Sequence, residues 1–308
     1  MTESIDALQL NLGDDSLMVM NVSLAVIMFG VALELTVQDF KDIAKNPKST
    51  LIGTFSQFIL LPSLTFVLVW LIEPAPSIAL GMFMVAACPG GNISNFFSLL
   101  AKGNAALSVS MTAIATLLAI VMTPLNFTFW ASLYAPTNAL LLEISLDLWQ
   151  VFKIIVLILG VPLIMGMIVR HFKAKLAEKI SPWIKGFGVI FFGGFVIVAF
   201  MKNFDNFIAY VQFVLLLVFI HNTVALAAGY GIATLFKLPE PDRRSISIET
   251  GIQNSGLGLL LIFNFFDGLG GMALITAWWA IWHILAGMSL SWYWSVGKKS
   301  IQRVISNA

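Results

Sequence analysis

The chain contains long apolar stretches that carry almost no charge, and this feature restricts its possible folds more than any other. A helix that crosses a bilayer needs about 20 mostly apolar residues. Runs such as Ile154 to Ile164 are apolar throughout instead of alternating with polar residues, which favours membrane helices over a β-barrel. Nine stretches satisfy the rule: residues 17–35, 50–72, 77–101, 105–134, 149–170, 183–201, 208–235, 242–266 and 272–296.

The composition agrees with an all-α polytopic membrane protein. The 308 residues include 17 Lys and Arg and 16 Asp and Glu, and 59% of the chain is hydrophobic. A soluble surface and a nucleic-acid-binding domain both need more charge, and a disordered chain is less hydrophobic. The stretches between spans are too short for an aqueous catalytic domain, so a single membrane domain over residues 1–308 and no enzymatic activity are predicted. The single cysteine, Cys88, excludes a disulfide framework and a Cys-based zinc site.

The positions of the basic residues predict the orientation. With nine spans and the N-terminus outside, 15 of the 17 Lys and Arg residues fall in inner loops or in the C-terminal tail, as the positive-inside rule requires. The third inner loop, which follows residue 170, holds Lys173, Lys175 and Lys179. The chain is therefore predicted to lie in a plasma (inner) membrane as a multi-pass protein with a cytoplasmic C-terminus.

Polar and helix-breaking residues interrupt two of the predicted spans. The third span contains CPGGNISN at residues 88–95, and the eighth contains SISIETGIQNSG at residues 245–256. Pro removes a helix hydrogen bond and Gly weakens a helix, so both spans are expected to break. The freed backbone groups must then face protein or a cavity instead of lipid. In the fourth span Ser108, Thr112 and Thr116 share one helix face, a spacing that by itself favours close helix packing.

Interrupted spans in corresponding places of two chain halves are typical of inverted-repeat secondary transporters. Here each interrupted span lies between two long apolar spans, and the two groups of three spans start on opposite sides of the membrane. The sequence therefore predicts inverted repeats with two broken helices, and a secondary active transporter.

The polar residues in these spans suit a sodium ion. Sodium is a hard cation that is bound by several oxygen ligands. Glu249 supplies one negative charge, and a carboxylate at the bilayer centre costs about 2.5–3.5 kcal/mol; snorkelling to the inner surface is the alternative for this residue. Clustered His or Cys would be needed for a transition metal, and the three His lie on different segments. The neutral ligands are expected from Gln57, Ser94, Asn95, Ser108, Thr112 and Gln253 and from carbonyl groups of Thr250 and Ile252.

An organic anion would complement the bound cation. The helix segments that begin after the two breaks point their positive dipole ends into the cavity. Asn92 and Asn254 stand near these ends and can donate hydrogen bonds to an anion. His283 either contributes to the same site or is a packed, hydrogen-bonded histidine.

Three stretches resemble the bile acid:sodium symporter family: SQFILLP at 56–62, CPGGNISNFFSLLAKGNAALSVSMT from Cys88, and RRSISIETGIQNSG from Arg243. The likeness covers about residues 20–296, and the short C-terminus points to a bacterial member. The resemblance implies a core domain of crossed broken helices (about 50–134 and 208–296) and a panel domain (about 17–35 and 149–201).

The resemblance also implies two sodium sites and a substrate crevice. The first site corresponds to Ser94, Asn95, Ser108, Thr112 and Glu249, and the second to Gln57, Glu249, Thr250, Ile252 and Gln253. The crevice would lie near Asn92, Asn254 and His283. Some bacterial members carry Asn where this chain has Ile284. The expected substrate is an organic anion, either bile-acid-like or a smaller carboxylate.

Other functions remain open at this point. The alternative within transport is proton coupling or metalloid extrusion, and a Cys88→Ala variant distinguishes it, because related exporters rely on a membrane cysteine. A receptor or a membrane enzyme would not need two broken spans. The expected partners are membrane lipid and a small organic anion, with no nucleic acid, and the sequence does not indicate an oligomeric state.

Overall fold

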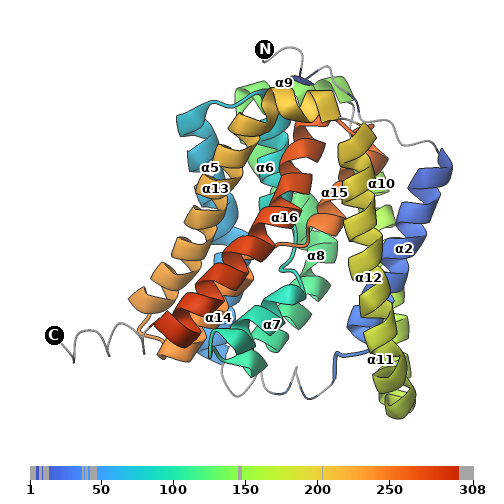
Figure 1. The fold of residues 1–308 in the computed structure, drawn as a ribbon, viewed down its shortest axis with the longest axis vertical. Helices are drawn as coiled ribbons and strands as arrows, with labels where there is room; N and C mark the ends of the chain where they lie inside the picture. The colour runs from blue at the N-terminus through green and yellow to red at the C-terminus, as the bar shows by residue number, and fades with distance from the viewer. Residues whose placement is uncertain are drawn as a thin grey trace.

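The computed structural model of the chain describes residues 5, 6, 9, 14–36, 38, 41, 47–144, 148–202 and 204–297. These residues form helices and no strand (Figure 1). The α-helices and the π-helical turns η1 to η3 are α2 (Asp14–Ala32), α4 (Pro47–Phe55), η1 (Ser56–Leu60), α5 (Leu61–Ile72), α6 (Pro76–Ala87), α7 (Ile93–Leu100), α8 (Ala105–Leu133), α9 (Ala135–Ile144), α10 (Leu148–Ile155), η2 (Val156–Gly160), α11 (Val161–Phe172), α12 (Ala174–Lys202), α13 (Phe204–Leu235), α14 (Glu240–Gly251), α15 (Ser255–Phe265), α16 (Gly270–Trp292) and η3 (Tyr293–Gly297).

Long apolar helices confirm that the chain is an all-α, multi-pass membrane protein. Their outward faces carry exposed large apolar side chains, such as Trp70, Leu157 and Phe213. Such a surface suits hydrocarbon better than water. Five helical segments are long and apolar enough to cross a membrane, and they match five predicted spans: Pro47–Ile72, Ala105–Leu133, Phe152–Phe172, Phe213–Leu235 and Gly270–Val296.

The two spans with helix-breaking residues are broken where the sequence predicts. The third predicted span is α6 followed by α7, and Cys88 to Asn92 lie between them in non-helical backbone. The eighth is α14 followed by α15, with Ile252 to Asn254 between them. The remaining predicted spans, 17–35 and 183–201, fall within or close to α2 and α12. The count of nine crossings stays a prediction.

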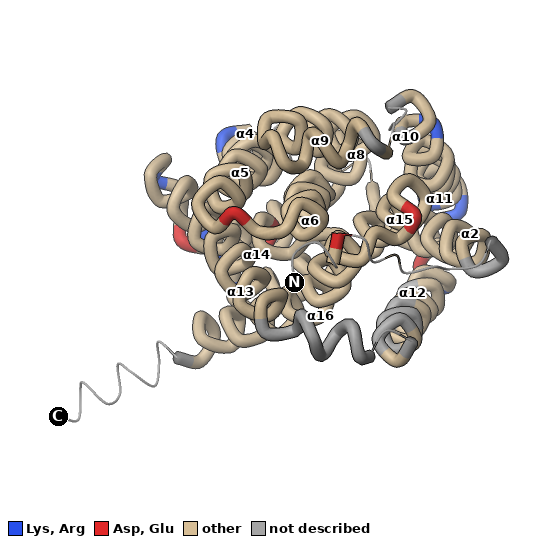
Figure 2. Tube along the Cα trace, turned by 90° about the horizontal axis from the view of Figure 1, so that it is seen from above, with Lys and Arg blue, Asp and Glu red and all other residues tan. Residues whose placement is uncertain are grey.

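The helices fall into two groups that lie side by side (Figures 1 and 2). In one group α2 packs against α11 and α12. In the other, α6 packs against α16 and α8, and α13 packs against α14. Contacts of α2 with α15 and of α10 with α8 join the two groups. Seen from above, most of the chain trace carries no charge (Figure 2).

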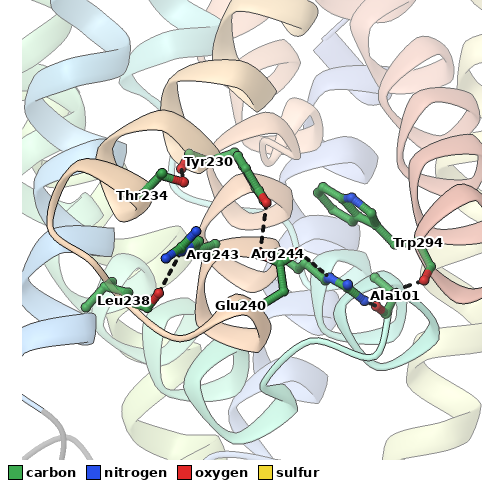
Figure 3. Close-up of polar contacts among 8 residues, drawn as sticks. All are labelled: Ala101, Tyr230, Thr234, Leu238, Glu240, Arg243, Arg244 and Trp294. Carbon is green, nitrogen blue, oxygen red and sulfur yellow. Dashed lines mark hydrogen bonds and ion pairs between the residues drawn. The ribbon is translucent and has the colours of Figure 1, made fainter. Parts of the chain in front are cut away.

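A polar network joins several helix ends on one side of the molecule (Figure 3). The Arg244 guanidinium forms an ion pair with Glu240 (3.0 Å) and donates to the carbonyl oxygens of Ala101 (2.9 Å) and Trp294 (3.5 Å). Tyr230 donates to Glu240 over 2.9 Å. These contacts fasten the end of α7 and the residues after α16 to the first turn of α14.

The segments that the sequence assigns to the inner side meet at this same end. Asp242 accepts hydrogen bonds from Ser49 (2.6 Å) and from the Asn104 amide (2.8 Å), and Lys48 donates to the Phe236 carbonyl (2.9 Å). Segments assigned to the outer side meet at the opposite end. There Asp6 accepts from the backbone N–H of Ser77 (2.8 Å), and Gln9 pairs with Leu269.

One predicted loop is helical instead. Only Lys173 separates α11 from α12, so Lys175 and Lys179 lie in the first turns of α12 and not in a loop. Lys is a good helix former, and an ion pair between Arg170 and Glu178 (3.0 Å) links the two helices. The basic residues predicted for the inner tail, Lys298, Lys299 and Arg303, lie outside the described residues.

Candidate functional site

The two helix breaks face each other at the centre of the site. The backbone N–H of Gly91 donates to the Ile252 carbonyl, and that of Asn254 donates to the Pro89 carbonyl, each over 2.8 Å. Gly90 and Gln253 form an isolated antiparallel bridge between these bonds. Backbone groups that a broken helix leaves unsatisfied are therefore paired with the other broken helix, as burial away from water demands.

A single carboxylate lies beside this crossing, at the end of α14. Glu249 is 1% exposed. Its Oε1 accepts hydrogen bonds from the hydroxyl groups of Ser94 (2.5 Å), Ser108 and Thr112 (3.1 Å), and its Oε2 lies 3.2 Å from the Thr112 hydroxyl. The three hydroxyls come from α7 and α8, so three helices converge on one charge. The position of Glu249 argues against snorkelling, because a snorkelling side chain would reach the surface.

Asn95 belongs to the same cluster. Thr112 approaches the Asn95 side-chain oxygen at 3.1 Å, the Ser108 carbonyl at 3.1 Å and the Glu249 carboxylate. A hydroxyl carries one proton and can donate to only one of these acceptors at a time. The cluster therefore contains more oxygen acceptors than hydrogens to donate to them, and a cation would complement the oxygen atoms that are left over. All five residues predicted for the first sodium site are thus adjacent in space.

Three of the residues predicted for the second sodium site, Gln57, Thr250 and Gln253, are also in contact with one another through hydrogen bonds. The Gln57 amide donates to the Cys88 carbonyl (3.0 Å) and to Gln253 Oε1 (2.7 Å). The Gln253 amide donates to the Thr250 carbonyl (2.8 Å). Gln57 and Gln253 are both at most 2% exposed. The Ile252 carbonyl accepts from Gly91, as described above, and no described contact places it in the Gln57 pair.

A π-helical turn places Gln57 at the site. Residues Ser56–Leu60 form η1, and Pro62, the second residue of the following helix α5, has a ring nitrogen with no hydrogen to donate. The Phe58 carbonyl therefore lacks a helical donor, and the Asn126 amide supplies one over 2.9 Å. Such π-bulges occur frequently at functional sites. The proline of the motif SQFILLP thus favours the wide π-helical turn that carries Gln57.

The three residues predicted for the substrate are not joined by any described contact. Asn92 and Asn254 precede α7 and α15, at the crossing. The Asn254 side-chain oxygen caps α15 by accepting from Leu257 (3.1 Å), whereas the Asn92 side chain makes no such capping bond. His283 lies on α16, is 6% exposed, and its Nδ1 has no hydrogen-bond partner among the described residues. Nδ1 therefore does not support the interpretation of His283 as a hydrogen-bonded packing residue.

Two further polar residues touch the site and were not predicted. The Ser56 hydroxyl pairs with the Thr250 hydroxyl at 2.8 Å. The Asn222 amide, from α13, donates to the Gly251 carbonyl at 2.7 Å. Asn222 is a polar residue inside a predicted apolar span, and that property alone could have singled it out.

A buried carboxylate at the crossing of two broken membrane helices is the arrangement of a secondary transporter. Residues 21–210 match the Sodium Bile acid symporter family, and the chain belongs to that family. The predicted family is thereby confirmed. The protein is a sodium-dependent membrane transporter and not an enzyme, and sodium is its coupling ion.

Relatives from bacteria, plants and animals agree. The Bacillus subtilis protein named "Uncharacterized sodium-dependent transporter YocS" is 35% identical over 281 residues, which are 91% of this chain and 84% of the relative. The rice protein named "Probable sodium/metabolite cotransporter BASS2, chloroplastic" is 30% identical over 83% of this chain and 63% of its own length. Human "Sodium/bile acid cotransporter 4" is 30% identical over 75% of this chain and 52% of its own length. The chain therefore spans most of the bacterial relative and only part of the other two.

Proposed function

We propose that the protein is a sodium-coupled symporter that carries a small organic anion across the plasma (inner) membrane by alternating access. The observation that carries this proposal is the Glu249 carboxylate with the Ser94, Ser108 and Thr112 hydroxyls around it. A buried charge in a membrane protein is costly without a partner, and a sodium ion at this carboxylate supplies one. The names of the relatives, which include sodium and bile acid or metabolite, support the same substrate class.

Two sodium ions fit the site better than one. The Glu249 cluster forms a first set of ligands with Asn95. The Gln57 and Gln253 side chains and the Thr250 and Ile252 carbonyl groups form a second set. These carbonyl oxygens accept one hydrogen bond each and keep a second lone pair for a cation. Two sodium ions with one monoanion move one net charge, which corresponds to about 2.3 kcal/mol per 100 mV.

The substrate anion is assigned to the starts of α7 and α15. Both helices begin at the crossing with an asparagine before their first turn, and helix starts favour negative charge. The uncapped Asn92 side chain is free to donate to a carboxylate, and the unpaired Nδ1 of His283 offers a further polar contact. A carboxylate smaller than a bile acid remains our choice of substrate.

Inverted repeats explain several regularities of the fold. Four tight turns contain a non-glycine residue with positive φ. The positions of these residues repeat in the two halves of the chain at a shift of about 165 residues: Glu73 corresponds to Lys237, and Lys102 corresponds to Asp267. The starts of α6 and α14, and of α8 and α16, follow the same shift. We therefore propose nine crossings with the N-terminus outside, a core domain (about 50–134 and 208–296) and a panel domain (about 17–35 and 149–201).

Sodium-dependent ligand stabilisation tests the proposed function. We expect the purified wild-type protein in detergent to gain thermal stability from a small carboxylate only when sodium is present, because both would bind the same folded state. A ligand at 100 times its Kd stabilises that state by about 2.7 kcal/mol. The measurement is a thermal-shift screen of organic anions in sodium chloride and in choline chloride at equal ionic strength. Equal shifts in the two salts would contradict sodium coupling, and a shift with metalloid oxyanions that disappears in Cys88→Ala would favour the exporter alternative.

Alternating access predicts that a link between the two domains blocks transport. Asn21 of α2 and Asn264 of α15 exchange two amide hydrogen bonds (3.1 and 2.9 Å) across the contact between the proposed panel and core. We expect a short thiol-specific cross-linker on an Asn21→Cys/Asn264→Cys pair, made in a Cys88→Ala background, to abolish uptake into liposomes while sodium still raises the melting temperature. The reason is that the ion site lies within the core and the link restrains only the relative motion.

The control is a link inside one domain. Lys48 at the start of α4 and Phe236 just after α13 are in contact, and both helices belong mainly to the proposed core. A Lys48→Cys/Phe236→Cys pair treated with the same reagent should keep its uptake. Full uptake by the Asn21/Asn264 cross-linked protein would contradict the proposed movement of core against panel.

A further inference from the structure

Asn222 is a buried carboxamide at the second helix break that the two sodium sites do not include. It lies on α13 and is 1% exposed. Its Nδ2 donates to the Gly251 carbonyl over 2.7 Å, and its Oδ1 is buried without a hydrogen-bond partner among the described residues. Burying a carboxamide inside a membrane domain is costly unless it is needed there. The hydrogen bond from Asn222 to the carbonyl of Gly251, the last residue of α14, indicates the role of this side chain.

The carbonyl groups at the end of α14 lack their usual helical donors. In a continuing helix the Gly251 carbonyl would accept from the N–H of Ser255, but that N–H donates to Gln253 instead (2.9 Å). The Thr250 carbonyl would accept from Asn254, whose N–H donates to Pro89. Each orphaned carbonyl therefore needs a donor from elsewhere.

Three different donors take their place. Gln253 donates to the Thr250 carbonyl, Gly91 to the Ile252 carbonyl, and Asn222 to the Gly251 carbonyl between them. Only Asn222 comes from outside the two broken spans. By holding the middle carbonyl toward α13, it fixes the peptide planes on both sides, and so the directions in which the Thr250 and Ile252 oxygens point.

The first helix break has a matching contact. There Gln57 donates to the Cys88 carbonyl, directly after the last residue of α6. In both cases a carboxamide on the long helix that precedes a broken span holds the carbonyl at the break. The separation of Gln57 and Asn222 is close to the shift of about 165 residues that relates the tight turns. Asn222 therefore occupies the position in the second half that Gln57, a proposed sodium ligand, occupies in the first.

We propose that Asn222 is a positioning residue for the second sodium site, where it holds the Gly251 carbonyl so that the Thr250 and Ile252 carbonyl oxygens face the ion. This inference rests on the proposed function, because it presupposes that sodium binds there. Asn222 contacts the Gly251 carbonyl and not the ion. Loss of this contact is expected to change the affinity for sodium.

Sodium titrations of Asn222 variants test this role. The melting temperature of purified protein is measured against sodium chloride concentration, with choline chloride keeping the ionic strength constant and no substrate present. In Asn222→Leu and in Asn222→Ala, whose side chains have no hydrogen to donate to the Gly251 carbonyl, we expect the half-saturating sodium concentration to rise about tenfold. Asn222→Gln, which keeps the amide, should recover part of the affinity.

Ser247→Ala is the matched control. The Ser247 hydroxyl donates to the Leu226 carbonyl (2.7 Å), so it joins the same helices, α14 and α13, away from the break. This variant should lower the melting temperature without sodium and leave the half-saturating concentration unchanged. If the Asn222→Leu and Asn222→Ala variants bind sodium as the wild type does, or if Ser247→Ala weakens sodium binding equally, the positioning role is wrong. A wild-type protein without any sodium response would instead overturn the proposed function itself. If Asn222→Leu does not fold, Asn222→Ala and Asn222→Gln alone decide the outcome.

Discussion

Replacing Glu249 with Gln is expected to abolish sodium binding and sodium-driven uptake. The amide keeps the shape of the side chain and can still pair with the Ser94 and Ser108 hydroxyls, but it removes the only negative charge in the cluster around these hydroxyls. Two unit charges about 4 Å apart attract by about 4 kcal/mol at an effective dielectric constant of 20, which corresponds to roughly a thousandfold in affinity. The measurements are the sodium dependence of the melting temperature and uptake into liposomes.

Loss of folding does not explain this expected result. A neutral amide costs less to bury than a carboxylate, so the variant should be at least as stable as the wild type when sodium is absent. Glu240→Gln is the control, because Glu240 pairs with Arg244 and Tyr230 at the helix ends, away from the crossing. It should lower stability and keep the sodium response. An unchanged sodium response in Glu249→Gln would remove the observation on which the proposed function depends.

A methyl group at Gly90 is expected to disrupt the ion site by direct collision. A Cβ atom there would lie 2.8 Å from Glu249 Oε2, closer than carbon and oxygen can approach. The carboxylate is held by three hydroxyl groups and cannot move away without losing them. We expect Gly90→Ala to lose about 1–3 kcal/mol of stability through overpacking and more than about tenfold in sodium affinity. Both quantities follow from the same sodium titration of the melting temperature.

Gly231→Ala is the matched control for this substitution. Gly231 lies in α13, and nothing lies within 4 Å of the position that its Cβ would take. Ala in a helix is more stable than Gly by about 0.5–1 kcal/mol, so this variant should be slightly stabilised with unchanged sodium affinity. Neither glycine has a positive φ, so backbone strain does not differ between the two variants. Normal sodium affinity in Gly90→Ala would show that the carboxylate is not confined as the contacts indicate.

Local sequence signals were sufficient to predict the class of fold and the location of the breaks. Apolar stretches of bilayer length predict membrane helices because lipid cannot satisfy backbone groups, and Pro89 with its neighbouring glycines marks the first break. The second break has no proline, and Gly251 and Gly256 predicted it. The loop after α11 was misjudged, because charge marks exposure to water but does not prevent a helix, as Lys175 and Lys179 demonstrate.

The choice of candidate ligands came from polar residues inside apolar spans, together with the family resemblance. That choice selected Glu249, Ser94 and Thr112 but could not give their mutual distances. Asn222 is also a polar residue inside an apolar span and was overlooked, but its role could not be predicted, because that role depends on which carbonyl of another helix loses its donor. The hydrogen bond from the Asn126 amide of α8 to the Phe58 carbonyl, in the π-helical turn that carries Gln57, was likewise not predicted, since it joins two segments that are distant in the sequence.

The sequence by itself determined three properties: that the chain spans a membrane, at which residues two of its helices break, and which residues bring oxygen atoms to the interior. These properties depend on the local balance between apolar surface and backbone hydrogen bonding, which each segment carries on its own. Only the tertiary structure decided that the two breaks face each other, that three hydroxyl groups converge on Glu249, and that Asn222 holds the Gly251 carbonyl. The reason is that a hydrogen bond between residues more than a hundred positions apart depends on how whole helices pack, and no single segment contains that information.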